Sequence, residues 1–188
     1  DILDETSFYD LGYMQSQIKR IQNEVARISK ELEINVELDE KSEYAVNKRQ
    51  ELIGQREVLL MHMIYLASNS FKNLEDCKKM AKGYRFSFME CVDGLQEYNA
   101  GNKNNAFDIL ENYFNNYGRV KKHFLINKVF GLLLLDRNEY QKATPYLTCA
   151  LQFVPDDIET LEALKICYEK LDIGYRVAIL DEILSVLA

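Results

Sequence analysis

The sequence predicts an all-α protein, and three observations carry that prediction. Apolar residues recur every three or four positions along most of the chain, which is the spacing of one helix face. The 188 residues include only 8 Gly and 2 Pro, too few for the frequent turns of a sheet protein. Leu, Glu, Lys, Gln and Ala, which favour helices, are abundant. We expect a long helical hairpin over residues 1–83 and a series of shorter hairpins over 84–188.

The clearest pattern is a heptad seam over residues 11–32. Its members alternate in steps of three and four: Leu11, Met14, Ile18, Ile21, Val25, Ile28 and Leu32. A seam this narrow packs on one other helix, as in a coiled coil. The flanking positions supply no complementary charges for a parallel twin, which favours an antiparallel partner within the chain. A homo-oligomer joined through this helix stays open as an alternative.

A second long helical pattern follows the acidic stretch 35–43. Either Asp39 or Ser42 is suited to cap it, since a short oxygen-bearing side chain accepts hydrogen bonds from free backbone amides. The pattern runs over residues 44–82, and Gly83 is expected to end it. This helix is the expected partner of the heptad seam.

From Tyr84 onward the helical patterns shorten and alternate with tight turns. They pair into three hairpins of about 35 residues each, which is the period of a helical repeat array. The expected helices cover residues 85–99, 103–117, 121–136, 139–153, 157–171 and 175–187.

The middle hairpin, residues 124–157, resembles a tetratricopeptide repeat. Its small and large residues stand at the offsets of that family: Gly131, Ala143, Leu147, Ala150 and Pro155. Small residues at these offsets let antiparallel helices touch, and the proline ends the second helix. The sequence departs from the family at Asn127, where a large aromatic is common, and at Pro145, which removes one helical hydrogen bond.

The neighbouring hairpins match less completely, and the resemblance covers residues 86–188. In the first hairpin the aligned residues are Gly94, Gly101, Ala106 and Leu110, with Gly118 in place of the proline. In the third they are Leu161, Leu164, Tyr168 and Ala178, which align only with an insertion near Ile173. The resemblance implies that the three hairpins form a short solenoid.

Tetratricopeptide arrays bind peptides or protein segments in a concave groove lined by the first helix of each hairpin. The positions that correspond here are Phe88, Cys91, Leu95, Tyr98, Leu125, Lys128, Leu132, Leu135, Glu159, Glu162 and Ile166. Because most are apolar, the groove suits an apolar peptide segment of another protein. The sequence leaves two versions open: an open groove, or a groove filled by the N-terminal helices.

Motifs for catalysis, metals and cofactors are absent from the sequence. The two histidines, His62 and His123, belong to no Glu-x-x-His or H-E-x-x-H motif, and no phosphate-binding glycine loop is present. We expect His62 to be a packing residue and His123 to be solvated at a helix start. The sequence therefore predicts a protein that is not an enzyme, with no metal and no cofactor.

The net charge and the cysteines limit which partners and which cellular compartment the sequence predicts. A net charge of −7 disfavours nucleic acid, and the two local basic clusters, 78–85 and 119–122, are interpreted as solvated helix ends. The longest apolar stretch, 58–67, is too short to span a membrane. The cysteines are Cys77, Cys91, Cys149 and Cys167, which form no C-x-x-C pair. Free thiols predict a reducing, cytoplasmic location.

The function that these features predict is non-catalytic protein binding, as an adaptor, scaffold or chaperone. One alternative is a bacterial secretion-type chaperone, because such acidic proteins are similar in size and carry three tetratricopeptide repeats. Another is a structural homo-oligomeriser joined by the heptad helix. The identity of the partner is not encoded in any pattern of the sequence, and neither is what precedes Asp1.

Overall fold

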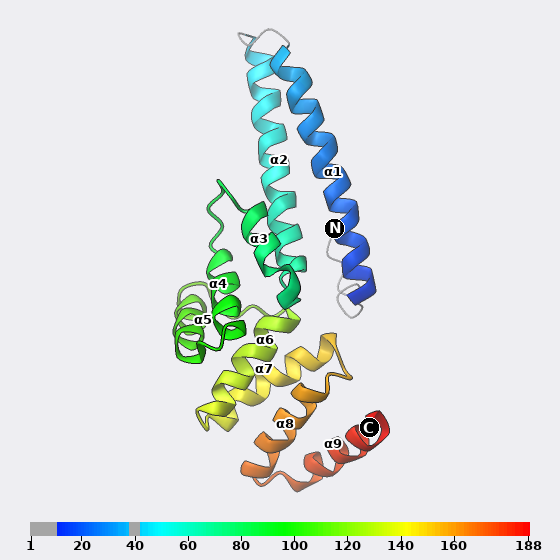
Figure 1. The fold of residues 1–188 in the computed structure, drawn as a ribbon, viewed down its shortest axis with the longest axis vertical. Helices are drawn as coiled ribbons and strands as arrows, with labels where there is room; N and C mark the ends of the chain where they lie inside the picture. Colours follow the sequence, from blue (N-terminus) through cyan, green and yellow to red (C-terminus); the bar gives the residue numbers. More distant parts are fainter. Residues whose placement is uncertain (1–10, 38–41) are drawn as a thin grey trace.

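The computed structural model of the chain describes residues 11–37 and 42–188. Within these ranges it contains nine α-helices, one 3-10 turn and no strand, so the all-α prediction is confirmed (Figure 1). The elements are α1 (Leu11–Glu37), α2 (Glu43–Ala67), η2 (Phe71–Asn73), α3 (Leu74–Met80), α4 (Met89–Asn99), α5 (Lys103–Tyr117), α6 (Phe124–Asp136), α7 (Tyr140–Phe153), α8 (Ile158–Lys170) and α9 (Gly174–Leu187). The α1–α2 hairpin forms an arm that extends from the shorter helices (Figure 1).

The heptad seam of α1 packs on α2 of the same chain, as the sequence favours. Ile21, Ile28 and Leu32 are buried, and Ile18 and Val25 are partly buried. The side chains of the two remaining seam residues, Leu11 and Met14, lie outside the described part of the chain. Near the arm's connecting loop, Ile28 and Leu32 form with Leu52 a small core that is separate from the main one.

The start of α2 agrees with the sequence prediction, and its end does not. Ser42 caps the helix by accepting a hydrogen bond from the amide of Ala45 at 3.1 Å, whereas Asp39 lies outside the described residues. The helix expected over residues 44–82 ends at Ala67. Ser68 and Asn69 cause the break, because their side chains donate to the carbonyls of Tyr65 and Leu66 that end the helix. A separate short helix, α3, follows.

The six later helices match their predicted ranges closely, with two late starts. Four begin within one residue of the expected position, whereas α4 begins at Met89 rather than 85 and α6 at Phe124 rather than 121. They pack as three sequential hairpins: α4 with α5, α6 with α7, and α8 with α9. The first helices also touch in series, α4 on α6 and α6 on α8. Pro145 lies inside α7, which continues past it.

Two glycines permit the close crossings within the first two hairpins. A Cβ atom at Gly131 would lie 2.6 Å from Cδ2 of Leu147, and one at Gly94 would lie 2.9 Å from Cδ2 of Leu110. Ala143 is fully buried at the same hairpin as Gly131. The small residues therefore stand where the helices touch, as the sequence pattern requires.

A buried polar junction attaches the arm to the hairpins. His123, expected to be solvated, has 0% exposure, so that expectation is wrong. Its Nδ1 accepts from the amide of Ile126 at 3.1 Å and caps α6, which leaves the hydrogen on Nε2. Nε2 then donates to Oγ of Ser68, 2.7 Å away. Asn69 adds a second link by accepting from the amide of Phe124 at 2.7 Å.

Asn127 completes this junction from inside α6. The family pattern has a large aromatic at this position, but the Asn127 side chain is fully buried and donates to two backbone carbonyls, of Val120 and His123. Those bonds hold the irregular segment before α6 against the helix. The departure from the family pattern therefore has a local structural reason.

We expect Gly131→Ala to destabilise the protein by roughly 1–3 kcal/mol, because its methyl group must displace Leu147. Gly54→Ala is the matched control: it is also in a helix interior, but nothing lies within 4 Å of its added Cβ. That control should be neutral or stabilising by up to about 1 kcal/mol. Urea unfolding measures both, and equal stabilities of the two variants would contradict the assigned crossing.

His123 should make the stability depend on pH below about 6.5. Burial lowers the pKa of His123 from 6.5 to about 3, so between these values the unfolded chain binds one more proton. The free energy of unfolding should fall as the pH falls, by up to about 1.4 kcal/mol per pH unit. His123→Asn, which keeps a capping oxygen, should lose this slope between pH 6.5 and 5. Identical slopes in urea unfolding at these pH values would refute the assignment.

Candidate protein-binding surfaces

Most of the groove predicted from the repeat pattern is buried. Phe88, Cys91, Leu95, Leu125 and Leu132 have exposures between 0 and 8%. Tyr98, Lys128 and Leu135 are half-buried, while Glu159, Glu162 and Ile166 are exposed. The apolar groove residues of the first two hairpins are therefore part of the hydrophobic core. Of the predicted groove residues, only those of the third hairpin are exposed to solvent.

The end of α2 and the turn that follows it cover the first part of this groove. The ring of Phe71 stacks on Tyr98 with centroids 6.1 Å apart, and the ring of Tyr65 lies 5.1 Å from Phe88. What stays open is a notch of about 350 Å³ between α1 and α6, lined in part by Ile18 and Leu125.

Lys128, predicted to line the groove, is tied to the start of α8. Its ammonium lies 2.9 Å from Asp157 and 2.7 Å from Glu159. Burial opposes its charge, but the hydrogen bonds to these carboxylates outweigh burial and raise its pKa. Asp157 in turn caps α8 by accepting from the amide of Thr160 at 3.0 Å. Lys128 thus joins α6 to α8 and is not a free cation for a ligand.

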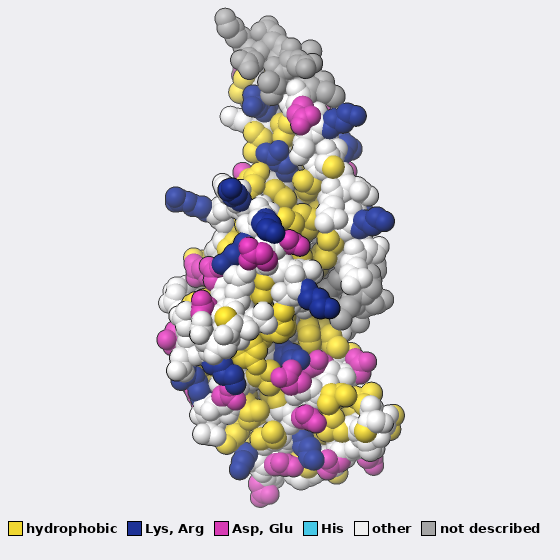
Figure 2. Space-filling view, in the orientation of Figure 1, with side chains coloured by type: hydrophobic (Ala, Val, Ile, Leu, Met, Phe, Trp, Pro, Cys, Tyr) yellow, Lys and Arg dark blue, Asp and Glu magenta, His cyan; other side chains and the backbone are white. Residues whose placement is uncertain are grey.

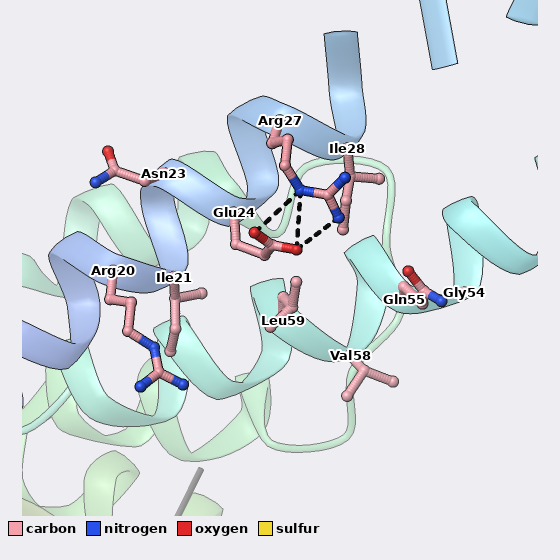
Figure 3. Close-up of a pocket in the computed structure, with 10 residues that line it drawn as sticks. All are labelled: Arg20, Ile21, Asn23, Glu24, Arg27, Ile28, Gly54, Gln55, Val58 and Leu59. Atoms are coloured by element: carbon pink, nitrogen blue, oxygen red, sulfur yellow. Dashed lines mark hydrogen bonds and ion pairs between the residues drawn. The ribbon is translucent and has the colours of Figure 1, made fainter. Parts of the chain in front are cut away.

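A larger open groove lies along the arm, between α1 and α2. It has a volume of about 800 Å³, and its lining residues are Arg20, Ile21, Asn23, Glu24, Arg27, Ile28, Gly54, Gln55, Val58 and Leu59 (Figure 3). Ile21 and Ile28 are buried at its floor, while the side chain of Val58 is 49% exposed. The space-filling view shows a band of hydrophobic side chains along the arm, bordered by Lys and Arg (Figure 2).

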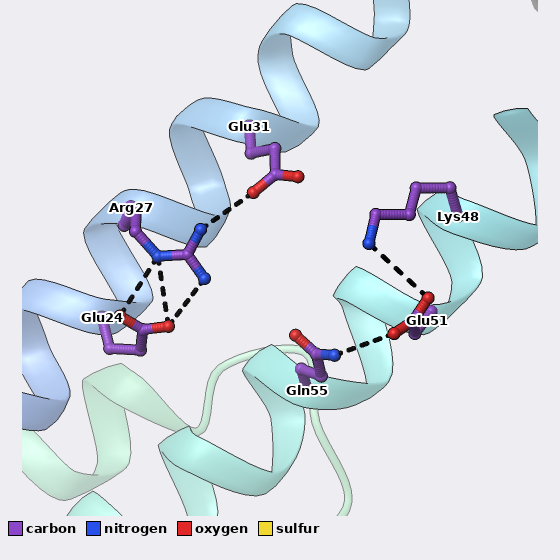
Figure 4. Close-up of polar contacts among 6 residues, drawn as sticks. All are labelled: Glu24, Arg27, Glu31, Lys48, Glu51 and Gln55. Atoms are coloured by element: carbon purple, nitrogen blue, oxygen red, sulfur yellow. Dashed lines mark hydrogen bonds and ion pairs between the residues drawn. The ribbon is translucent and has the colours of Figure 1, made fainter.

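The polar residues beside this groove pair along each helix (Figure 4). On α1, Arg27 lies 2.7 Å from Glu24 and 3.0 Å from Glu31. The hydrogen bond from Arg27 lowers the pKa of Glu24. On α2, Glu51 pairs with Lys48 at 3.7 Å and accepts from Gln55 at 3.1 Å. Among the described side chains of the arm, no ion pair joins α1 to α2, so the mouth of the groove is not bridged.

The sequence predicts both helices of the arm but not the groove between them. Val58 begins an apolar run, 58–67, in which periodicity does not separate an inner from an outer face. Gly54, four residues and about one helical turn before Val58, is a signal that could have indicated the groove, since a glycine inside a helix leaves room for a neighbour. Val58 and Gly54 are therefore candidate binding-site residues that the sequence analysis did not include.

The described residues offer little for chemistry. They contain no group of three His, Cys, Asp or Glu side chains placed to hold a metal ion. Cys77, Cys91 and Cys167 are buried free thiols, and burial raises the pKa of Cys77 to about 12. None of the described helices has the length and apolar composition that crossing a bilayer requires.

Comparisons with known proteins do not assign the chain. No protein-family model matches the sequence, and neither a curated protein nor a solved structure matches it significantly. The site must therefore be argued from its own geometry.

If the predicted groove is core, Leu132→Ala should cost roughly 2–5 kcal/mol, because it removes a side chain with 8% exposure. Ile166→Ala serves as the control, since Ile166 was predicted to line the same groove but is 41% exposed. It should change the free energy of unfolding by less than about 0.5 kcal/mol. Urea unfolding measures the free energy of unfolding of both variants. Small and equal decreases for Leu132→Ala and Ile166→Ala would mean that the groove is open.

Proposed function

We propose that this protein is a non-catalytic adaptor that binds another protein in the groove between α1 and α2. The observation that carries the proposal is the open groove itself, whose uncovered apolar lining is the exposed Val58 and the half-buried Leu59 of α2. Uncovered apolar surface is unfavourable in water, and contiguous patches of it commonly mark partner sites. A groove between two helices suits protein segments better than the filled groove of the hairpins does.

In this proposal the three hairpins are a short tetratricopeptide-like solenoid that serves as the base of the arm. The close approach of Gly131 to Leu147 supports it, as do the complete burial of Ala143 and Ala150 and the serial packing of α4, α6 and α8. Each hairpin of such an array buries its apolar face on its neighbours. A base built in this way holds the arm at one orientation.

The heptad helix is less suited to join copies of the chain, because its seam is occupied. Ile21, Ile28 and Leu32 are buried in the pairing of α1 with α2. A homo-oligomer through the same seam would have to open that hairpin. The adaptor proposal needs no such opening. It places the protein in the cytoplasm, where the thiols of its cysteines stay reduced.

Val58→Glu tests the proposal in the cell of origin. The substitution puts a charge on the groove wall, so partner capture should be lost, while stability should change little because the side chain is already 49% exposed. Val46→Glu is the control, since Val46 is 43% exposed on the same helix but does not line the groove. Affinity capture of both variants with identification of the bound proteins is the measurement. Equal capture by the two variants would remove the groove from the function.

A further inference from the structure

We propose that the outer face of α9 is a dimerisation surface, on which α9 of a second copy of the chain packs in the antiparallel direction. The observation behind the proposal is a continuous stripe of exposed apolar side chains on this helix. The stripe lies apart from the arm groove, so this inference does not rest on the proposed function. A dimer joined through α9 would carry two arm grooves.

The stripe runs along one side of α9 in steps of four, four and three residues. Its members are Tyr175, Ile179, Ile183 and Val186, and their exposures range from 39% to 83%. These steps keep the four side chains on one face of the helix. Single exposed apolar residues are ordinary on a protein surface, but a contiguous row of them commonly marks an interaction site.

The opposite face of α9 is apolar as well. Val177, Leu180 and Leu184 lie there and pack on the core of the hairpins. Among the described helices, α9 packs substantially only on α8, and it forms the end of the row of hairpins (Figure 1). A helix that is apolar on both sides is normally covered on both, and a repeat array needs a polar outer face on its last helix to stay soluble. Because α9 has an apolar outer face, a second layer is expected to cover it.

The charges beside the stripe select a second copy in the antiparallel direction. Arg176 lies in the first turn of α9, and Glu182 follows six residues later. Nε of Arg176 lies 3.0 Å from the hydroxyl of Tyr175, so the guanidinium is held at the edge of the stripe. Neither Arg176 nor Glu182 makes an ion pair within the described part of the chain. In an antiparallel pair centred on Ile179, each Arg176 stands level with Glu182 of the other copy, whereas a parallel pair would align like charges.

The position of Arg176 has no benefit for α9 alone. A cation in the first turn of a helix is unfavourable to the dipole of that helix, and the only hydrogen-bond acceptors within reach are the hydroxyls of Tyr168 and Tyr175. A second α9 in the antiparallel direction would bring the carboxylate of Glu182 to this end. The same contact forms twice, because a two-fold pair uses one patch on both copies.

The apolar area is sufficient for a dimer. With Leu187 at its end, the stripe exposes on the order of 500 Å² on each copy, so pairing two copies covers roughly the 1,000 Å² that a specific interface requires.

Sedimentation velocity of the full chain at increasing concentrations, up to about 100 µM, tests the proposal. We expect a monomer–dimer equilibrium in the parent. Ile179→Glu places two carboxylates at the centre of the pair, so the dimer should be lost. The melting temperature of the diluted protein should stay the same, since Ile179 is already 53% exposed. Val46→Glu is the matched control, because Val46 is exposed on the arm, and it should dimerise like the parent.

Two charge variants test the direction of pairing. Arg176→Glu and Glu182→Arg should each weaken the dimer by about two- to thirtyfold, because each creates like charges at both ends of the pair. A one-to-one mixture of the two variants should recover the parent affinity, since every contact of the mixed pair again joins opposite charges. Single variants that dimerise like the parent, with a mixture that dimerises more tightly, would instead indicate parallel pairing and overturn the proposed direction.

The remaining outcomes each decide against the dimer. A parent that stays monomeric at every concentration would overturn the proposal, even if another protein is captured through Ile179. Dimers that survive Ile179→Glu would assign self-association to a different surface. Val58→Glu should leave the dimer unchanged, so failure of the arm groove and failure of the dimer are measured separately. Loss of the dimer in Val58→Glu would place the second copy in the arm groove and overturn the role of α9.

Discussion

A buried hydrogen bond between His123 and Ser68 fixes the point where the arm joins the hairpins, within an apolar core that both parts share. One ring nitrogen of His123 accepts a hydrogen bond from the first turn of α6, and the other donates to Ser68, the residue that ends α2. A single imidazole ring thus links the ends of two helices. It is stable only while neutral, because burial opposes its protonation. Asn69 strengthens the same link by accepting from the amide of Phe124. The orientation of the arm on the hairpins depends on this junction.

That attachment decides which surface stays uncovered. Because α2 ends at the junction, the chain turns back and places Phe71 on Tyr98 of α4. The apolar residues of that face then join one core, which extends from Ile21 of α1 to Leu180 of α9. The groove that stays uncovered lies on the arm, away from the hairpin crossings. The groove on the arm and the packing of the hairpins thus use different surfaces.

Local periodicity was enough to predict the helical fold, the seam and the glycine crossings, but not where α2 ends. The steps from Leu11 to Leu32 and the small residues Gly131 and Ala143 are visible within a few turns of chain. The burial of His123 could not be predicted, because its hydrogen-bond partner Ser68 is 55 positions away. The break at Ser68 and Asn69 is made by local bonds to backbone carbonyls, but the apolar periodicity continues past both residues and hides it. The groove between α1 and α2 was not predicted for a different reason. Its two walls come from different helices, and the residue pattern of a single helix does not indicate the space between two helices.

The most direct test of the account is photo-crosslinking from two positions of the intact chain in its source cell. A photoreactive side chain in place of Val58 would lie on the wall of the arm groove, and one in place of Ile166 on the exposed part of the predicted repeat groove. The account predicts a crosslinked partner from position 58 and none from position 166. A partner crosslinked from position 166 alone would contradict it and assign binding to the helical hairpins.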